Sequence, residues 1–301
     1  MADKGLTIHE GNEAPILARL TTLRLGGAVL AEVRLSEREV ASALPEIANR
    51  LGGKLICLGA GSNILAGEGP LPLVVVRNSM PPKIGVVAED SHTIILRANA
   101  SVKLPLLLRR AAMDGLAGLE GLSGIPGTVG GAVAMNAGSY GQSVADTLTA
   151  LEIVTCTGEI KRFTRDEIVF GYRAMGLPDT QGWWMVTAAE FRLARNDPET
   201  VRAKGRECIA QKQATQPVTA ASAGCVFKNP FPENPAGKLL DAAGFKGKRL
   251  GGMAFSSMHA NFLVNEGTGT SREAFALLEE AKEAVLAKFG VVLEPEVKLW
   301  G

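Results

Sequence analysis

The sequence predicts an α+β protein of two or three domains, and three observations favour this class. The 301 residues have an ordinary globular composition, with 46% hydrophobic and 21% charged side chains. Domains usually hold roughly 100–200 residues, so this length favours two or three of them. Short β-branched runs alternate with capped helical segments. A glycine-rich stretch in the middle third has too few bulky side chains to bury much apolar area by itself.

The first 80 residues predict a small α/β unit. Ser36-Glu37-Arg38-Glu39 matches a capping box, so a helix is expected from there towards Gly52, interrupted at Pro45. Short buried strands are expected over residues 54–58 and 73–77, because both runs are apolar and β-branched.

The middle third predicts more strands and one helix. Strands are expected over residues 93–98, 151–156 and 184–193. A helix is expected over residues 105–113, closed by Gly115. This region is therefore α+β.

Two helices organise the last third. Asp197-Pro198 predicts an N-cap followed by proline at the first helical position, and the helix should run to about Lys212 as a domain boundary. Thr270-Ser271-Arg272-Glu273 predicts a second capping box, and Gly290 should end that longer helix. Apolar residues at helical spacing predict its buried face, namely Phe275, Leu278, Val285 and Phe289.

Charge and hydropathy argue against several classes of protein. The net charge of +1 predicts no nucleic-acid partner and no anionic membrane surface. The polar N-terminus lacks a signal peptide pattern, and the longest apolar runs fall far short of the roughly 20 residues of a membrane span. We therefore expect a cytoplasmic protein, and no segment indicates an obligate protein partner.

The cysteines do not form a metal-binding pattern. Cys57, Cys156, Cys208 and Cys225 include no CxxC pair, and the chain has only three histidines. We predict no metal site and free thiols, as expected in a reducing compartment.

The first glycine motif follows the strand expected at 54–58. It reads Gly59-Ala60-Gly61-Ser62-Asn63-Ile64. Ile64 stands where a dinucleotide fingerprint needs its third glycine, so a Rossmann site is disfavoured. No GxxxxGK[ST] sequence occurs, so an ATPase has little support. Two interpretations remain open, which are a phosphate-binding nest of backbone amides and a plain strand-to-loop turn.

The second glycine region covers residues 121–141. Its glycines would let the backbone approach a ligand closely, and its amides suit a large anion such as a pyrophosphate. The alternative is a compact loop of tight turns without a ligand.

Five segments together resemble a known family. In order they are Gly59–Asn63, residues 121–141, Gly171-Tyr172-Arg173, Ser222-Ala223-Gly224-Cys225-Val226-Phe227-Lys228-Asn229-Pro230 and Leu293-Glu294-Pro295-Glu296-Val297. From about Thr22 to the C-terminus the chain resembles the UDP-N-acetylenolpyruvoylglucosamine reductases of peptidoglycan synthesis. The last two segments are the most specific, because other flavoproteins share the glycine block.

The resemblance implies a fold, a cofactor and a reaction. The fold is the FAD-binding fold of the vanillyl-alcohol-oxidase/PCMH type, with two α/β subdomains at 1–80 (plus a C-terminal strand at 297–301) and 81–200, and a substrate domain at 201–296. NADPH reduces FAD, and the reduced FAD then passes a hydride to the β-carbon of the enolpyruvyl group. We expect non-covalent FAD, because the three histidines lie outside the glycine blocks.

The resemblance also assigns residues to FAD. Their shared property is a place in one of the two glycine regions. They are Gly59, Ala60, Gly61, Ser62, Asn63, Ile64, Gly124, Gly127, Thr128, Gly130, Gly131, Ala137, Gly138, Tyr140 and Gly141.

Three residues match the catalytic positions of the family. Arg173 would stabilise the developing carboxylate charge, and its alternative is a surface ion pair. Cys225 stands where the family commonly has serine, and as a thiol with an ordinary pKa of about 8.5 it could donate the proton to the α-carbon. Its alternative is a buried structural cysteine. Glu296 would assist in activating the enolpyruvyl group, with Glu294 as its competitor.

Six residues match positions that contact the UDP-sugar. They are Tyr172, Lys212, Asn229, Lys238, Lys246 and His259. Lysines suit a diphosphate, although each alone is more often a surface residue; Tyr172 could be core and His259 structural. The stretch between Arg173 and Cys225 is too short for the tyrosine-bearing insert of the longer subclass, so the chain resembles the shorter subclass.

Two rival functions remain. A flavoenzyme of the same fold that oxidises an alcohol or sugar with oxygen would be reduced by that alcohol and not by NADPH. A non-catalytic protein that binds FAD or a UDP-sugar would show binding without turnover.

Overall fold

The computed structural model describes residues 5–178, 180 and 182–301, which form two compact units. Unit 1 holds the described residues within 1–13, 30–60 and 72–211, and unit 2 holds residues 14–29, 61–71 and 212–301. Each unit is therefore assembled from three separate stretches of the chain. The division into three domains near residues 80, 200 and 296 stays a prediction.

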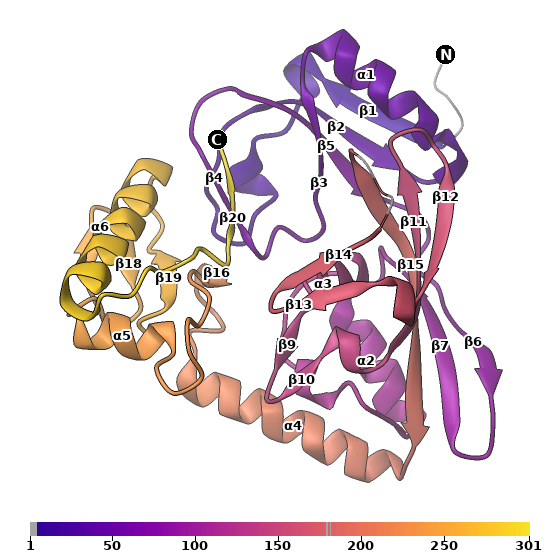
Figure 1. The fold of residues 1–301 in the computed structure, drawn as a ribbon. Helices are drawn as coiled ribbons and strands as arrows, with labels where there is room; N and C mark the ends of the chain where they lie inside the picture. Colours follow the sequence, from indigo (N-terminus) through magenta and orange to yellow (C-terminus); the bar gives the residue numbers. More distant parts are fainter. Residues whose placement is uncertain (1–4, 179, 181) are drawn as a thin grey trace. The chain divides into compact units, whose positions relative to one another are not determined.

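Two sheets form the framework of unit 1 (Figure 1). The smaller has the order β1-β2-β5-β3, with its outer pair β3 and β5 parallel; its strands are β1 (Leu6–Glu10), β2 (Val29–Leu35), β5 (Leu71–Asn78) and β3 (Lys54–Cys57). The larger has the antiparallel order β12-β11-β15-β7-β6, with β8 also paired to β15; its strands are β6 (Ile84–Glu89), β7 (Thr93–Asn99), β8 (Leu116–Ala117), β11 (Leu148–Thr155), β12 (Ile160–Thr164) and β15 (Trp184–Arg195). Two short hairpins complete the unit, β9 (Gly138–Ser139) with β10 (Gln142–Ser143), and β13 (Val169–Gly171) with β14 (Ala174–Gly176).

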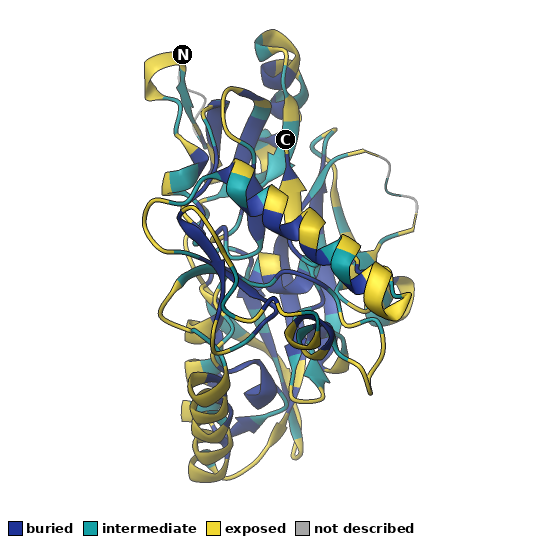
Figure 2. Ribbon diagram, turned by 90° about the vertical axis from the view of Figure 1, so that its left-hand side faces the viewer, coloured by how far each residue is buried: buried dark blue, intermediate teal, exposed yellow. Residues whose placement is uncertain are grey.

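The helices α2 (Leu104–Met113) and α3 (Val129–Ala134) of unit 1 pack against the larger sheet. Unit 1 also holds α1 (Leu44–Leu51) and most of α4 (Pro198–Thr215). Apolar side chains of α2 and α3 join those of β7, β11 and β15 in one core cluster. Figure 2 shows buried residues in dark blue along strands inside the molecule. A second cluster fills the space between α1 and the smaller sheet. The glycine loops of unit 1 thus stand on well-packed elements.

Unit 2 has its own core. The sheet order is β16-β19-β18-β17, formed by β16 (Ala221–Cys225), β19 (Phe262–Asn265), β18 (Met253–Phe255) and β17 (Arg249–Leu250). The helices α5 (Ala236–Ala242) and α6 (Ser271–Phe289) contribute side chains to the same core cluster. The parallel pair β4 (Ile64–Ala66) and β20 (Lys298–Trp300) joins the first glycine motif to the end of the chain.

Short 3-10 helices connect several of these elements. They cover Gly11–Glu13, Leu17–Arg19, Arg38–Ala43, Glu120–Leu122, Val144–Asp146 and Arg165–Glu167.

Most expected elements are confirmed. The five expected strands appear as β3, β5, β7, β11 and β15, and the expected helices as α2, α4 and α6. Asp197 accepts a hydrogen bond from the Thr200 amide at 2.7 Å, as an N-cap should. Thr270 and Glu273 form the capping box of α6, and Gly290 ends the helix at a φ of 67°.

Two local predictions are wrong. No side chain caps the segment after Ser36; a 3-10 helix over Arg38–Ala43 comes first, and α1 begins at Leu44 with Pro45 in its first turn. Proline lacks an amide hydrogen, so it starts this helix and does not interrupt it. Phe289 is 37% exposed because it lies in the last turn of α6, beyond the core.

Among the described residues, no helix is long and apolar enough to cross a membrane.

Candidate active site

The two glycine regions touch each other in unit 1. Gly59 follows β3, and Thr128 is the N-cap residue of α3, where its side-chain oxygen accepts a hydrogen bond from the Gly131 amide at 3.3 Å. A Cβ added to Gly59 would lie 2.9 Å from the Thr128 Oγ1 atom. A side chain at Gly59 would therefore occupy the space beside Thr128. We call this space between Gly59 and Thr128 the cradle, and it depends on glycine at position 59.

Backbone amides without hydrogen-bond partners lie around the Gly59–Thr128 contact. In the part of the chain that the structure describes, the amides of Gly59, Ala60, Gly127 and Thr128 have no hydrogen-bond acceptor. Backbone amides without partners are donors for an anion such as a pyrophosphate. This arrangement fits FAD and favours the nest over the plain turn.

Further along, the amides at the start of α3 are already occupied. The Gly130 amide donates to the Ala100 carbonyl at 3.0 Å, and a Cβ on Gly130 would lie 2.8 Å from the Ala100 Cβ. Gly130 and Gly131 therefore serve close packing and capping, and they do not supply free amides. Gly124, also predicted to contact FAD, has a φ of 82° that suits glycine.

The segment from Ala137 to Gly141 forms a tight, strained hairpin. The Ala137 amide donates to the Ala132 carbonyl at 2.8 Å, which joins the hairpin to α3. Tyr140 has a φ of 50°, and its side chain is 44% exposed. Positive φ at a bulky residue costs free energy and is often retained at functional sites. The Ser139 hydroxyl donates to the Gly121 carbonyl, so both ends of the second glycine region are tied together.

Arg173 contacts this hairpin. It lies in the turn between β13 and β14 with a φ of 55°. Its Nη2 atom donates to the Gly138 carbonyl at 2.7 Å, and its guanidinium lies 5.0 Å from the centre of the Tyr172 ring. Tyr172 is 50% exposed, so the alternative of a core tyrosine is wrong. The predicted arginine and a predicted FAD residue are therefore direct neighbours in unit 1.

The rest of the first glycine motif belongs to unit 2. Gly61 has a φ of 67°, and a Cβ there would lie 2.1 Å from the Leu20 carbonyl oxygen. Asn63 donates from Nδ2 to the Glu296 carbonyl at 3.1 Å, and its own carbonyl accepts from the Lys298 amide at 2.9 Å. Asn63 thereby links the first motif, whose strand β4 starts at Ile64, to the C-terminal segment.

The same C-terminal segment lies next to Cys225. The half-buried Cys225 ends β16, directly after Gly224 with its φ of 79°. The Glu296 amide donates to the carbonyl of the next residue, Val226, at 2.8 Å. Unit 2 therefore brings Asn63, Cys225 and Glu296 into neighbouring segments.

Burial separates Glu296 from its competitor. The side chain of Glu294 is 71% exposed and forms an ion pair with Lys228 at 3.1 Å. Glu296 is half-buried. The more enclosed carboxyl is the better candidate for acid chemistry, which supports the choice of Glu296.

Three of the predicted UDP-sugar residues, Asn229, Lys238 and His259, lie around the start of α5. Asn229 accepts from the Ala236 amide at 3.1 Å through its side-chain oxygen. A Cβ on Gly237 would lie 3.0 Å from the His259 ring, and Lys238 is the next residue. Lys246 forms a surface ion pair with Asp241 at 3.4 Å.

The surroundings of His259 favour its neutral imidazole. Burial lowers its pKa, and the positive charge of Lys246 lowers it further. Its Nδ1 atom accepts a hydrogen bond from the Asn261 amide at 3.2 Å. The proton of the neutral ring therefore lies on Nε2, which makes that atom a donor.

Lys212 and Ser62 are two further predicted site residues of unit 2. Lys212 is only 4% exposed although it is a lysine near the end of α4. Ser62 lies in the turn before β4. Both make contacts within the chain.

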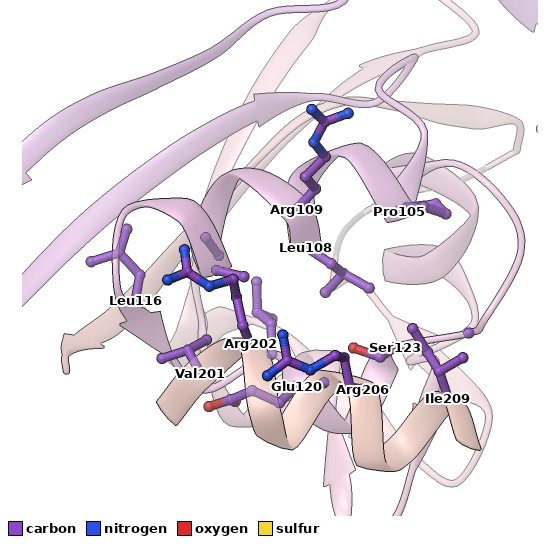
Figure 3. Close-up of a pocket in the computed structure, with 15 residues that line it drawn as sticks. Pro105, Leu108, Arg109, Leu116, Glu120, Ser123, Val201, Arg202, Arg206 and Ile209 are labelled. Carbon is purple, nitrogen blue, oxygen red and sulfur yellow. The ribbon is translucent and has the colours of Figure 1, made fainter. Parts of the chain in front are cut away.

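A cavity of about 270 Å³ lies elsewhere in unit 1, between α2 and α4 (Figure 3). Its walls are mainly aliphatic, with Leu108, Leu119 and Ile209 among them. Gly124 is the one predicted site residue in its lining. Arg202 and Arg206 at its edge are both ion-paired with Glu199. We therefore do not identify this cavity with the site.

Two asparagines of the site escaped the sequence analysis. Asn136 is 8% exposed with a φ of 41°, and it donates from Nδ2 to the Gly171 carbonyl at 3.0 Å, which supports the turn that carries Arg173. Asn261 is 1% exposed and contacts the segment after Cys225. Asparagine tolerates positive φ, so its place inside a glycine run was a usable signal for Asn136. For Asn261 no local pattern existed.

Two family comparisons cover most of the chain. Residues 29–164 match the family described as FAD binding domain. Residues 216–300 match the family described as UDP-N-acetylenolpyruvoylglucosamine reductase, C-terminal domain. The expected FAD-binding fold with a C-terminal substrate-domain family is thereby confirmed.

Individual relatives agree with this result. The chain is 49% identical over 287 residues to the UDP-N-acetylenolpyruvoylglucosamine reductase of Nitratidesulfovibrio vulgaris, covering 95% of this chain and 97% of the relative. It is 48% identical over 288 residues to that of Oleidesulfovibrio alaskensis, covering 95% and 96%. The crystal structure of the reductase from Thermus caldophilus superposes with a TM-score of 0.79 at 32% identity, covering 98% and 100%. The chain belongs to the UDP-N-acetylenolpyruvoylglucosamine reductase family.

Proposed function

We propose that this chain reduces UDP-N-acetylenolpyruvoylglucosamine to UDP-N-acetylmuramate, a step of peptidoglycan precursor synthesis, with FAD as cofactor and NADPH as reductant. The observation that carries the proposal is near full-length similarity to reductases of that name, at 49% identity over 95% of this chain. The local geometry is consistent with it, because each unit contributes a distinct part of the required chemistry.

The FAD site is formed from glycines and unpaired amides. Gly59 and Thr128 lie close together, and the unpaired backbone amides of residues 59, 60, 127 and 128 would bind the pyrophosphate. When bound, FAD supplies the redox chemistry by accepting a hydride from NADPH and passing it to the substrate. Tyr140 and Gly141, in the strained hairpin of the same unit, would contact the cofactor.

Arg173 would stabilise negative charge on the substrate. Hydride addition to the β-carbon of the enolpyruvyl group leaves the electron pair of the double bond on the α-carbon and its carboxylate. A fixed guanidinium suits a carboxylate, and the bond from Arg173 to the Gly138 carbonyl fixes its position.

Cys225 would complete the reaction by protonating the α-carbon. The S–H bond breaks as the new C–H bond forms, and solvent then returns a proton to the thiolate. Glu296, in the adjacent segment, would assist as a protonated acid that hydrogen-bonds the enolate. Hydride and proton together add one H₂ equivalent across the double bond, and NADPH is oxidised to NADP⁺.

Six residues are proposed to bind the UDP-sugar. Asn229, Lys238 and His259 lie around the start of α5, and Lys246 lies close enough to influence the pKa of His259. The Nε2–H group of His259 would donate to the substrate, whereas the lysines would face its diphosphate. Tyr172 and Lys212 complete the set.

A cytoplasmic location belongs to the same proposal. All four cysteines are free thiols in the structure, which is typical of a reducing compartment. The three-domain division of the sequence analysis is also retained as a proposal. It assigns the C-terminal strand at 297–301 to the first subdomain, and the pairing of β20 with β4 supports that assignment.

Steady-state turnover tests the proposal. We expect the purified protein with FAD to oxidise NADPH only when UDP-N-acetylenolpyruvoylglucosamine is present, and the product mass to exceed that of the substrate by two hydrogens. An oxidase of the same fold would consume oxygen with an alcohol and ignore the enolpyruvyl sugar. A binding protein would take up FAD or the sugar without turnover. Either result would replace the proposed reaction.

A further inference from the structure

Asn261 is a buried polar residue that has no part in the proposed chemistry. Its side chain is 1% exposed, and it lies directly before β19, two residues after His259. Burying an amide without partners is costly, so both its oxygen and its nitrogen need hydrogen bonds.

The backbone of one residue, Phe227, satisfies both ends of that side chain. Asn261 Oδ1 accepts from the Phe227 amide at 3.0 Å, and Asn261 Nδ2 donates to the Phe227 carbonyl at 2.8 Å. The backbone carbonyl of Asn261 accepts from the Val226 amide at 2.9 Å. Phe227 is itself fully buried, so its amide and carbonyl would have no access to water if Asn261 were lost.

The clamped segment lies next to two proposed reacting groups. Residues 226–228 follow Cys225 directly. On their other side the Glu296 amide donates to the Val226 carbonyl at 2.8 Å, and the Lys228 amide donates to the Glu294 carbonyl at 2.8 Å. A shift of Phe227 would therefore move the Cys225 thiol and the Glu296 carboxyl relative to each other.

Asn261 also acts on His259. The Asn261 amide donates to the Nδ1 atom of His259 at 3.2 Å, which holds the ring in the Nε2–H form. One residue thus couples the proposed proton donor, the proposed acid and a proposed substrate contact.

We propose that Asn261 is a positioning residue for substrate reduction, which sets the geometry of Cys225, Glu296 and His259 without touching the substrate. The inference rests on the proposed function of these three residues. Misplacement by about 1 Å can cost roughly 100-fold in rate, so a clamp of this kind has a large effect on the chemical step.

An Asn261→Asp variant separates positioning from simple stability. The aspartate keeps an acceptor for the Phe227 amide but turns an oxygen towards the Phe227 carbonyl, and the two repel unless the carboxyl is protonated. Burial raises the pKa of such a carboxyl, so the clamp should work at low pH and fail as the pH rises. We expect sugar reduction to fall about 100-fold relative to the parent protein at pH 8, and the ratio to recover as the pH is lowered. Reduction of FAD by NADPH should not change.

Asn265 provides a matched control. It lies at the other end of β19, donates to the Leu23 carbonyl at 3.1 Å, and accepts from the Gly267 amide at 2.9 Å. Asn265→Asp has the same charge change at the opposite end of β19 but leaves Phe227 untouched. We expect it to lower the melting temperature without a selective, pH-dependent loss of sugar reduction.

Hydrogen exchange gives a readout that does not depend on activity. The Phe227 amide should stay protected in Asn261→Asp, which keeps its acceptor, and should exchange faster in Asn261→Ser, whose side chain is too short to reach it. If the aspartate variant does not fold, the serine variant carries the test, with selective loss of sugar reduction and no recovery at low pH.

The proposal is overturned if both half-reactions fall in proportion, or if Asn265→Asp shows the same pH-dependent loss. If the parent protein itself does not reduce the sugar, the proposed function has failed and not the clamp.

Discussion

The proposed FAD cradle of unit 1 and the proposed acid groups of unit 2 are held by different physical means. In unit 1 the proposed FAD cradle is made of backbone, where the close approach of Gly59 and Thr128 leaves amides without partners. In unit 2 the proposed acid groups are side chains, held by strand pairing and by the Asn261 clamp. A site made of backbone amides is blocked when a glycine gains a side chain, whereas a site made of reacting side chains is impaired when their functional groups are replaced. Variants should therefore separate cofactor binding from substrate reduction.

The largest expected effect follows from removing the proposed proton donor. Cys225→Ala should slow reduction of the sugar about 10³-fold, because proton transfer by a positioned group contributes 10²–10⁴-fold. Reduction of FAD by NADPH should continue at the parent rate, as stopped-flow absorbance would show. Cys156→Ala is the matched control, since Cys156 is also half-buried but lies in the turn after β11. If Cys225→Ala impaired both half-reactions equally, Cys225 would be structural.

Removal of the guanidinium should have the next largest effect. Arg173→Ala should slow sugar reduction about 10²-fold, the usual cost of losing one donor to a developing charge. FAD content should be retained, because the cradle at Gly59 does not depend on this side chain. Arg165→Ala serves as control. The Arg165 guanidinium lies 4.8 Å from the ring centre of Phe170, in the β13–β14 hairpin whose turn carries Arg173. A rate loss shared by both variants would indicate a general disturbance of the hairpin.

A smaller effect should follow from filling the cradle. Gly59→Ala places a Cβ 2.9 Å from Thr128 Oγ1 and so strains the N-cap of α3. Loss of an N-cap costs about 1 kcal/mol, so we expect the Kd for FAD to rise roughly fivefold. Titration of apoprotein by fluorescence would measure it. Gly85→Ala on β6, where a Cβ meets open space, should leave the Kd unchanged. Equal Kd values for the two variants would contradict the cradle.

The smallest effect concerns His259 and pH. Burial lowers its pKa in the folded state below the ordinary value of about 6.5. Between these two pKa values the unfolded state binds more protons, so the free energy of unfolding should fall as the pH drops below about 6.5. His259→Gln should reduce the change of the free energy of unfolding with pH, measured by urea unfolding between neutral and mildly acidic pH. His92→Gln, on an exposed turn, controls for the loss of an imidazole. Identical slopes in the parent protein and His259→Gln would exclude His259 as the source.

The sequence predicted the elements of this fold better than their arrangement. Local signals identified α2, α4 and α6 correctly, because proline, capping residues and a terminal glycine act over a few residues. The segment after Ser36 shows the limit, since its local pattern matched a cap that the structure does not form.

Long-range pairing explains what the sequence could not reveal about the site. The contact of Asn63 with Glu296, and that of Asn261 with Phe227, join residues far apart in the chain. The occupied amides of Gly130 and Gly131 could not be inferred either, because a glycine has the same sequence signal whether it packs closely or binds a ligand. The site roles themselves follow from the resemblance to a family.

An anaerobic spectrum of the purified protein with FAD tests the central claim most directly. We expect the visible flavin band to bleach on addition of NADPH and to return on addition of UDP-N-acetylenolpyruvoylglucosamine, because the two half-reactions share one cofactor. A protein that bound no FAD would contradict the cradle in unit 1. A flavin that NADPH bleached but the sugar did not restore would contradict the substrate assigned to unit 2.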